Sequence, residues 1–357
     1  MKQINRNIEI YNFDPNAKNI LLCFPGGGET VSEFINYTNF KSIASTVIAF
    51  NGQSTNNKYS FQNVYPWIEK SIAQNDILTI DSVLSNLYNN KIPQNIFLTG
   101  KSDGGGFCIL YANLSKYKSK IKGIGICSSA HFGKDSISNI GIYCKNNSYL
   151  LKIIPTIVNI YDDVLSINKP ITIITKNDDS NIPYNIITPP SNISIFIMHG
   201  TADTVMPYEG QLYNNSLAKL KASISIWPEI DRCLNNTYTV NFPSYTNAII
   251  KQLGTLSECH YVPNSTTYSY FSASNLAGNV INSITIVGQD HCWSGHINSG
   301  PNSSITNTAN FQLDATYLLT LFFNLDLGNY TNSSMPNTYK TIPSNLKTYN
   351  NKPLNKY

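Results

Sequence analysis

Short runs of mainly apolar residues, separated by segments with helical spacing, constrain the fold of this chain more than any other feature of its sequence. Within residues 76–87, Ile77, Ile80, Leu84 and Leu87 recur every three or four positions, which predicts an amphipathic helix. Apolar runs without a polar face are typical of strands buried on both sides in a parallel sheet. The sequence therefore predicts an α/β fold, with a mainly parallel sheet covered by helices. Strands are expected at 20–24, 46–50, 95–100, 123–127, 193–198 and 284–288, and further helices at 105–114 and 311–325.

Differences in pattern along the chain set the expected domain organisation. The 357 residues are long enough for two domains, but α/β enzymes of this length are often one, and we expect a single domain over 1–325. Residues 132–190 lack regular spacing and end in two prolines, so we interpret them as an insertion or lid over the sheet. Residues 326–357 are polar, contain three prolines and are expected to form a wrapping or mobile tail.

Composition excludes several classes of protein. Hydrophobic residues make up 41% of the chain and charged residues 13%, which excludes a chain kept disordered by its charge. The net charge of +4 comes without a basic run, so no nucleic-acid partner is expected. No stretch approaches about 18 uninterrupted apolar residues, so no membrane span is expected. The seven cysteines are scattered and include no Cys-x-x-Cys pair, so neither a zinc site nor a redox motif is predicted.

A candidate nucleophile lies between a predicted strand and a predicted helix, where residues 100–104 read Gly-Lys-Ser-Asp-Gly. A serine raised above the end of a sheet needs a sharp, strained turn, and glycines beside it avoid clashes. The pattern in this context predicts Ser102 as the nucleophile. A glycine-rich turn with a capping serine is the structural alternative. A phosphate-binding loop fits less well, because the leading glycine of that motif is missing.

A serine that attacks an acyl carbon needs a general base and a carboxylate that orients the base. In α/β-hydrolases these residues follow the serine in the order Asp, then His. Asp203 comes after the strand expected at 193–198, and His291 comes after the strand expected at 284–288. Both are therefore expected on the same edge of the sheet as Ser102, with Asp203 as the orienting acid and His291 as the base. An aspartate that caps the following helix is the structural alternative for Asp203.

The other histidines fit the role of base less well. His199 precedes Asp203 so closely that no contact between the two is expected, and we assign it to anchoring its own loop. Asp290 is disfavoured as the orienting acid, because it would have to turn back on itself to reach the ring of His291. The remaining histidines follow no comparable strand or lie in a polar loop; they are His131, His260 and His296.

An oxyanion hole needs backbone N–H donors from the residue after the nucleophile and from the loop after an early strand. The first donor would be Asp103. The second would come from the turn at 25–28, which reads Pro-Gly-Gly-Gly, through Gly27 or Gly28. The sequence does not choose between these two glycines, and a plain glycine turn is the alternative.

These motifs together resemble the polyhydroxybutyrate depolymerase-like esterases, an α/β-hydrolase group that includes feruloyl and acetyl xylan esterases. Beyond residues 100–106, the matching segments read His-Gly-Thr-Ala-Asp at 199–203 and Asp-His-Cys-Trp at 290–293. Residues 227–233 are similar to the family's Trp-rich segment ending in Cys, and the resemblance spans roughly residues 18–325. It implies a serine esterase of the α/β-hydrolase fold that acts on a small-molecule or polymeric ester with no metal and no cofactor.

The chain also departs from the family pattern. Phe24 and Pro25 stand where the first glycine loop usually carries a histidine, Ser294 replaces a proline, and the insertion at 132–190 is long. Tannase-type relatives join a cysteine before the serine to one after the histidine, but Lys101 occupies the first of these positions.

Cysteine pairing and cellular location are linked expectations. In a secreted relative, Cys233 and Cys259 would be a plausible staple between the acid and base loops, and a bridge closing about 26 residues would add roughly 3 kcal/mol. The first residues contain no apolar stretch typical of a secretory signal, however, which favours the cytoplasm, where disulfides rarely persist. We therefore predict seven free thiols in a cytoplasmic protein.

The sequence predicts hydrolysis of carboxylic esters through an acyl-enzyme. A serine peptidase of the prolyl-oligopeptidase type is the enzymatic alternative, since it would use the same three residues. A binding protein on an inactive hydrolase scaffold is the alternative outside enzymes.

Overall fold

The computed structural model describes residues 7–55, 58–61, 70–129, 190–205, 208, 250, 255–262, 268–296, 313–332 and 342–354. Nine strands of the described chain form one sheet, and two short ones, β4 (Gln53–Thr55) and β5 (Lys58–Ser60), pair separately. The strands of the large sheet are β1 (Ile8–Tyr11), β2 (Asn19–Phe24), β3 (Thr46–Phe50), β6 (Asn95–Lys101), β7 (Ile121–Cys127), β8 (Ser194–Gly200), β9 (Leu256–Val262), β10 (Tyr268–Asn275) and β11 (Val280–Ile286). The longer helices are α1 (Val31–Thr38), α2 (Lys70–Leu87), α3 (Asp103–Leu114) and α9 (Ala315–Phe322).

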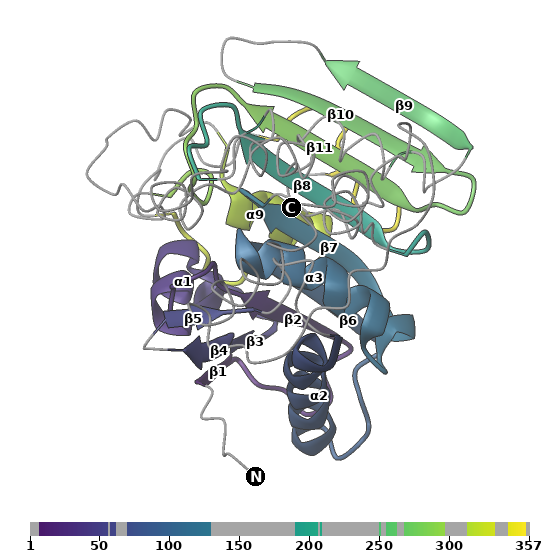
Figure 1. Cartoon of the computed structure of the whole chain (residues 1–357). Coiled ribbons are helices and arrows are strands. Elements are labelled where there is room, and N and C mark those ends of the chain that lie inside the picture. The colour runs from purple at the N-terminus through teal and green to yellow at the C-terminus, as the bar shows by residue number, and fades with distance from the viewer. Residues whose placement is uncertain are drawn as a thin grey trace, which may run out of the picture.

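The large sheet is parallel through its centre and antiparallel at both ends. Its strand order is β1-β3-β2-β6-β7-β8-β11-β10-β9, and Figure 1 shows β1 at one end and β9 at the other. Strands β3, β2, β6, β7, β8 and β11 pair in parallel, whereas β1, β10 and β9 pair antiparallel. The chain runs outward from β2 to β3 and then crosses back to β6, so the strand order reverses between β2 and β6. Ligands of open α/β sheets bind outside the carboxyl ends of the strands at such a point.

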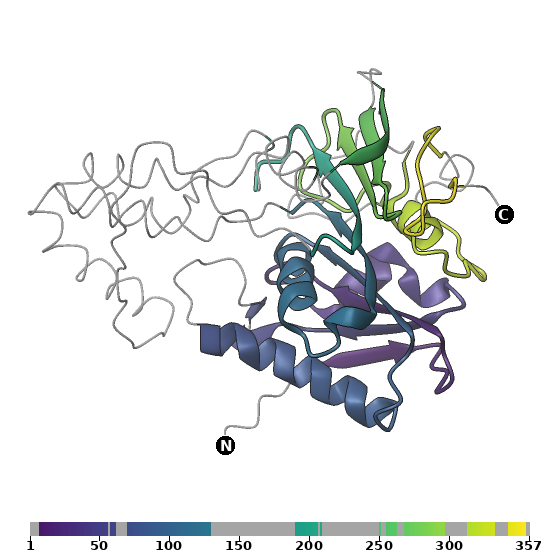
Figure 2. The ribbon, with the colours of Figure 1, turned by 90° about the vertical axis from the view of Figure 1, so that its right-hand side faces the viewer.

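Helices cover both faces of the sheet, which explains why its central strands are apolar on both sides. One core cluster joins strand residues such as Leu21 and Val47 to apolar residues of α1 and α9. The other joins Leu22 and Ile48 to apolar residues of α2 and α3. Figure 2 shows α1 and α9 on one side of the twisted sheet and α3 on the opposite side. The sequence prediction of a mainly parallel sheet covered by helices is confirmed.

Most of the predicted elements are present, with shifted ends. Strands occur at all six predicted places, and the helix predicted at 76–87 lies within the longer α2. The helix predicted at 311–325 is shorter, because α9 begins after the capping residue Asp314 and ends at Phe322. Strands β1, β9 and β10 and helix α1 were not predicted from the sequence.

Two regions singled out in the sequence differ in how much of them is described. The insertion predicted at 132–190 lies, apart from Pro190, outside the described residues. Part of the C-terminal segment is described, and there Leu346 and Leu354 are buried in the core cluster of α1 and α9. The backbone N–H of Tyr349 donates to the carbonyl of Phe322 at 2.8 Å, so this segment packs against the end of α9.

Candidate active site

Ser102 occupies a sharp turn between the end of β6 and the start of α3. Its backbone has φ 50° and ψ −119°, a conformation that is strained for a residue with a side chain. The glycines beside it are required by close packing: a Cβ added to Gly104 would lie 2.0 Å from the carbonyl oxygen of Phe24, and one added to Gly100 would lie 2.4 Å from the Gly104 carbonyl carbon. The Ser102 side chain is partly exposed at the carboxyl edge of the sheet.

Asp203 and His291 come together from loops that follow β8 and β11, which are neighbours in the sheet. The ring Nδ1 of His291 lies 2.8 Å from Oδ2 of Asp203, and both residues are 4% exposed. A buried carboxylate at this distance fixes the ring orientation and favours the tautomer with a proton on Nδ1. Nε2 is then left as the basic nitrogen.

His199 lies closer to Asp203 than the sequence suggested. Its Nε2 is 3.5 Å from the same Oδ2 that His291 contacts, so the expectation that the two residues would not meet is wrong. The chain turns back directly after β8, where the backbone N–H of Asp203 points to the carbonyl of Gly200 at 3.4 Å. This turn brings residues four positions apart side by side.

Asp290 joins the loop after β8, which carries Asp203, to the loop after β11, which carries His291 and is called the histidine loop below. Its Oδ1 accepts hydrogen bonds from the backbone N–H of Thr204 at 3.0 Å, the hydroxyl of Thr204 at 2.9 Å and the backbone N–H of His291 at 2.7 Å. Through these bonds the carboxylate of Asp290 holds the two loops together. The sequence prediction that Asp203, rather than Asp290, contacts the ring agrees with this geometry.

Two serines at the end of β7 connect the turn at Ser102 to the histidine loop. Ser129 Oγ donates to the carbonyl of Ser102 at 2.7 Å, and Ser128 Oγ donates to the carbonyl of Cys292 at 2.8 Å. Strand β7 lies between β6 and β8, so its end bridges the two halves of the site. Sequence reasoning missed both serines, although they directly follow a predicted strand. No hydrogen bond joins Ser102 Oγ to His291 in the described structure, and catalytic hydrogen bonds often tighten only with substrate present.

The glycine turn after β2 lies beside Ser102 and Asp103. A Cβ added to Gly26 would be 3.5 Å from Cβ of Ser102, and one added to Gly27 would be 2.8 Å from Oδ2 of Asp103. Gly27 and Gly28 are exposed, and Gly28 has φ +82°, which favours glycine. All three candidate oxyanion residues, Asp103, Gly27 and Gly28, are therefore in the neighbourhood of Ser102, and both glycines stay candidates.

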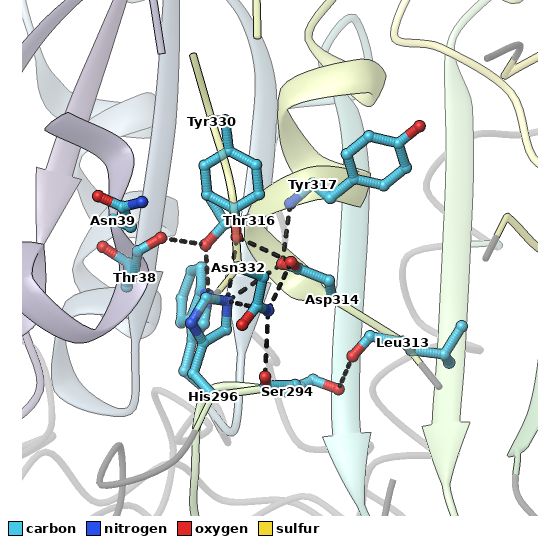
Figure 3. Close-up of polar contacts among 12 residues, drawn as sticks. Thr38, Asn39, Ser294, His296, Leu313, Asp314, Thr316, Tyr317, Tyr330 and Asn332 are labelled. Carbon is cyan, nitrogen blue, oxygen red and sulfur yellow. Dashed lines mark hydrogen bonds and ion pairs between the residues drawn. The ribbon is translucent and has the colours of Figure 1, made fainter. Parts of the chain in front are cut away.

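A buried polar network around Asp314 supports the end of the histidine loop (Figure 3). Oδ1 of Asp314 lies 3.1 Å from Nε2 of His296, and Oδ2 accepts from the Tyr330 hydroxyl at 2.8 Å and from Nδ2 of Asn332 at 2.7 Å. His296, expected in a polar loop, is in fact 4% exposed. The same carboxylate caps α9 through the backbone N–H of Tyr317. The histidine loop is thereby tied to the first turn of α9.

Cysteines near the site are buried thiols. Burial raises the pKa of Cys127 to about 11 and, with the neighbouring Cys127, that of Cys292 to about 12. The described cysteines are free, and Cys259 is exposed; the remaining ones, Cys144 and Cys233, lie outside the described residues. Among the residues described, no three His, Cys, Asp or Glu side chains are grouped so that they could hold a metal ion. In the same ranges no helix is both long and apolar enough to cross a membrane.

Comparison with known proteins gives likeness in structure but not in sequence. No family model matches the chain. No curated protein matches it either. An acetyl xylan esterase from Aspergillus awamori shares 11% identity at a TM-score of 0.41, over 86% of this chain and 94% of that one. A phospholipase/carboxylesterase from Dyadobacter fermentans shares 14% identity at a TM-score of 0.40, over 83% of this chain and 93% of that one.

A carboxylesterase from Bacillus cereus is also similar, at 12% identity and a TM-score of 0.33, over 70% of this chain and 94% of that one. The fold class itself follows from the sheet and its first helix connections. The reversal of strand order beside β2, the antiparallel edge strand β1 and the strained serine between β6 and α3 are the features of an α/β-hydrolase. The chain has the α/β-hydrolase fold.

Proposed function

We propose that this protein is a serine hydrolase that cleaves carboxylic esters. The hydrogen bond of 2.8 Å between His291 Nδ1 and Asp203 Oδ2, at the sheet edge that also carries the strained Ser102, is the observation on which the proposal depends. The resemblance in sequence motifs extends the proposal to small esters and polyesters.

In the first half of the reaction, Ser102 Oγ bonds to the ester carbonyl carbon while His291 Nε2 takes the hydroxyl proton. The carbonyl electron pair moves to oxygen, and backbone N–H groups of Asp103 and of Gly27 or Gly28 stabilise this oxyanion. Asp203 stabilises the imidazolium that forms. When the oxyanion collapses, the bond to the alcohol oxygen breaks, and His291 gives its proton to the departing alcohol.

In the second half, water attacks the acyl-enzyme in place of the serine. His291 takes a proton from the water as its oxygen bonds to the acyl carbon, and a second oxyanion forms in the same position. Its collapse breaks the bond to Ser102 Oγ, which recovers its proton from His291. The products are one carboxylic acid and one alcohol, and the chain returns to its starting state without a cofactor.

The test combines a covalent probe with a substrate series. A fluorophosphonate should label Ser102, as located by peptide mapping, and a chain-length series of p-nitrophenyl esters should be hydrolysed, with a polyester suspension assayed in parallel. Labelling of a different serine would contradict the nucleophile assignment. Cleavage of peptide p-nitroanilides in preference to esters would favour the peptidase alternative. The absence of both labelling and turnover would favour a binding protein.

A further inference from the structure

A buried lysine, Lys101, directly precedes Ser102, and its charge is paired with that of a glutamate. Lys101 is the last residue of β6, and its side chain is 2% exposed. Lysine is almost never this buried unless its charge is paired. The ammonium group of Lys101 forms an ion pair with Oε1 of Glu29, whose side chain is 22% exposed. This ion pair thus lies next to the turn that carries Ser102.

The carboxylate of Glu29 contacts three separate parts of the structure. Its Oε2 accepts a hydrogen bond from the backbone N–H of Gly26 at 3.0 Å and another from the hydroxyl of Tyr37, on α1, at 2.8 Å. Its Oε1 accepts from the Lys101 ammonium. Burial, and then the charge of Glu29, raise the pKa of Tyr37 well above its ordinary value, so this hydroxyl stays protonated and remains a donor.

The register of β2 against β6 brings Lys101 and Glu29 next to the turn at residues 26–28, which holds the candidate oxyanion donors Gly27 and Gly28. Strands β2 and β6 pair with Phe24 opposite Gly100, so the residues that follow each strand lie side by side. Glu29 closes the turn in both directions: its own backbone N–H donates to the carbonyl of Gly26 at 3.2 Å, while its side chain accepts from the Gly26 N–H. Gly26 in turn lies close to Ser102, since a Cβ added to Gly26 would be 3.5 Å from the Cβ of the serine.

The charge of Lys101 matters as much as the hydrogen bonds. A lone carboxylate at the base of the turn would repel the negative charge that develops on the substrate oxygen in the transition state. The ammonium of Lys101 cancels that charge while leaving the carboxylate able to accept hydrogen bonds. The pair thus offers a hydrogen-bond anchor with no net charge next to the candidate oxyanion donors.

We propose that Glu29 is a positioning residue that fixes the 26–28 turn for oxyanion binding, with Lys101 as its obligatory counter-ion. This inference rests on the proposed ester hydrolysis. Removing a single oxyanion donor costs about 10²–10³-fold in kcat in a well-studied serine hydrolase. Loss of the anchor displaces the donors without deleting them, so a smaller loss, about 10–100-fold in kcat with little change in KM, is expected for Glu29→Ala.

A double-substitution cycle separates positioning from simple stabilisation. Lys101→Met leaves the Glu29 charge uncompensated and should lower kcat more than Glu29→Gln does. In the combined Lys101→Met/Glu29→Gln variant the repelling charge is gone, so kcat should rise above that of Lys101→Met alone. Glu33→Ala is the matched control, because Glu33 is a nearby glutamate in the first turn of α1 whose carboxylate, among the described residues, bonds to the capping residue Thr30 and not to the 26–28 turn. It should leave kcat within about twofold of the wild-type value.

Affinity for a transition-state mimic gives a second readout. A trifluoromethyl ketone adds to the serine and carries an oxyanion, so its inhibition constant should rise across the variants in proportion to the loss of kcat/KM. All assays are run well below each variant's melting temperature. An unchanged kcat in Glu29→Ala, or a double variant no better than Lys101→Met, overturns the inference while ester hydrolysis stands. Absence of both ester turnover and Ser102 labelling in the wild type overturns the proposed function itself.

Discussion

Two serines have backbone conformations that most side chains avoid. Among the described residues other than glycine and asparagine, only Ser102 and Ser128 have positive φ, at 50° and 48°. Asparagine tolerates this region well, whereas serine does so at a cost. One of the two is the candidate nucleophile and the other donates a hydrogen bond to the histidine loop. At the scale of single residues, backbone strain is thus concentrated at the site.

The strained backbone of Ser102 predicts that a substitution there can remove activity and yet stabilise the fold. Ser102→Gly should abolish ester hydrolysis and raise the free energy of unfolding by about 1 kcal/mol, because glycine adopts positive φ without strain. Ser102→Ala should abolish activity equally but bring no such gain, since alanine keeps the strained Cβ. Urea unfolding of both variants measures the difference. Equal stability of the two variants would mean that the turn is not strained.

The two aspartates of the site should differ sharply in their effect on rate. Asp203→Asn keeps the shape but removes the charge that holds the His291 ring, and the corresponding change in a serine protease lowers kcat by about 10⁴-fold. Asp290→Asn retains an Oδ1 that accepts from the His291 N–H, so its loss should be far smaller. Steady-state kinetics on one p-nitrophenyl ester compare them. A larger loss at Asp290 would reverse the assignment of the acid.

Thiol reactivity should follow burial and pKa. Only the thiolate reacts with alkylating reagents, and the raised pKa values of about 11 for Cys127 and about 12 for Cys292 keep both protonated at neutral pH. Iodoacetamide at pH 8 should therefore modify the exposed Cys259 and spare these two, with their labelling rising only as the pH approaches their pKa values. Peptide mapping after timed alkylation measures this. Rapid labelling of Cys292 at pH 8 would contradict its burial.

At the scale of elements, the histidine loop depends on the start of α9. Asp314→Ala removes a helix cap and the buried carboxylate that accepts from the Tyr330 hydroxyl and from Nδ2 of Asn332. We expect the free energy of unfolding to fall by about 3 kcal/mol. Asp326→Ala is the control, because this exposed carboxylate accepts only from the Gly328 N–H in a surface turn, and its loss should be below about 1 kcal/mol. Similar losses in the two variants would refute the special role of Asp314.

The central strands were predictable because each is buried on both faces and therefore contains a run of mainly apolar residues. Strand β10 was not, since polar residues occupy buried places there: the hydroxyl of Ser272, 1% exposed, donates to Oδ1 of Asn282 on β11 at 2.7 Å. Such cross-strand pairing leaves no apolar signal in the sequence. Strand β9 was not predictable either, because it lies at the edge of the sheet and residues 256–260 are half-buried or exposed. Helix α1 does carry a signal in the sequence, the capping box of Thr30 and Glu33.

In the candidate site, too, some residues could be identified from the sequence and others could not. Ser102, Asp203 and His291 were identifiable, because each follows a recognisable strand and chemistry restricts the residue type. The contacts of His199 and Asp290 depend on how two loops turn back on themselves, and the Lys101–Glu29 pair depends on the register of β2 against β6. Neither loop conformation nor register can be deduced from the residues of one segment alone.

At the scale of the whole molecule, the C-terminal segment completes the core. The described residues 342–354 bury Leu346 and Leu354, and the ring of Tyr349 packs edge-on against Phe97 at 4.8 Å between centroids. Deleting 342–357 should lower the melting temperature by about 10 °C, because two buried leucines contribute about 4 kcal/mol. Thermal unfolding followed by circular dichroism measures this. An unchanged melting temperature would show that the segment is only a loosely attached tail.

The distance along the chain between Asp203 and His291 sets when the site can first exist during folding. Their hydrogen bond joins residues 88 positions apart, and it depends on the parallel pairing of β8 with β11. Long-range parallel pairing is slow, because a large loop must close before any contact rewards it. Helices α2 and α3 and the strand pairs β2–β3 and β6–β7 use much shorter connections and are expected to form earlier. If Ser102 and His291 act as proposed, a newly made chain therefore forms the Ser102 turn before it has a base to activate the serine, and it would hydrolyse no ester until β11 is in place.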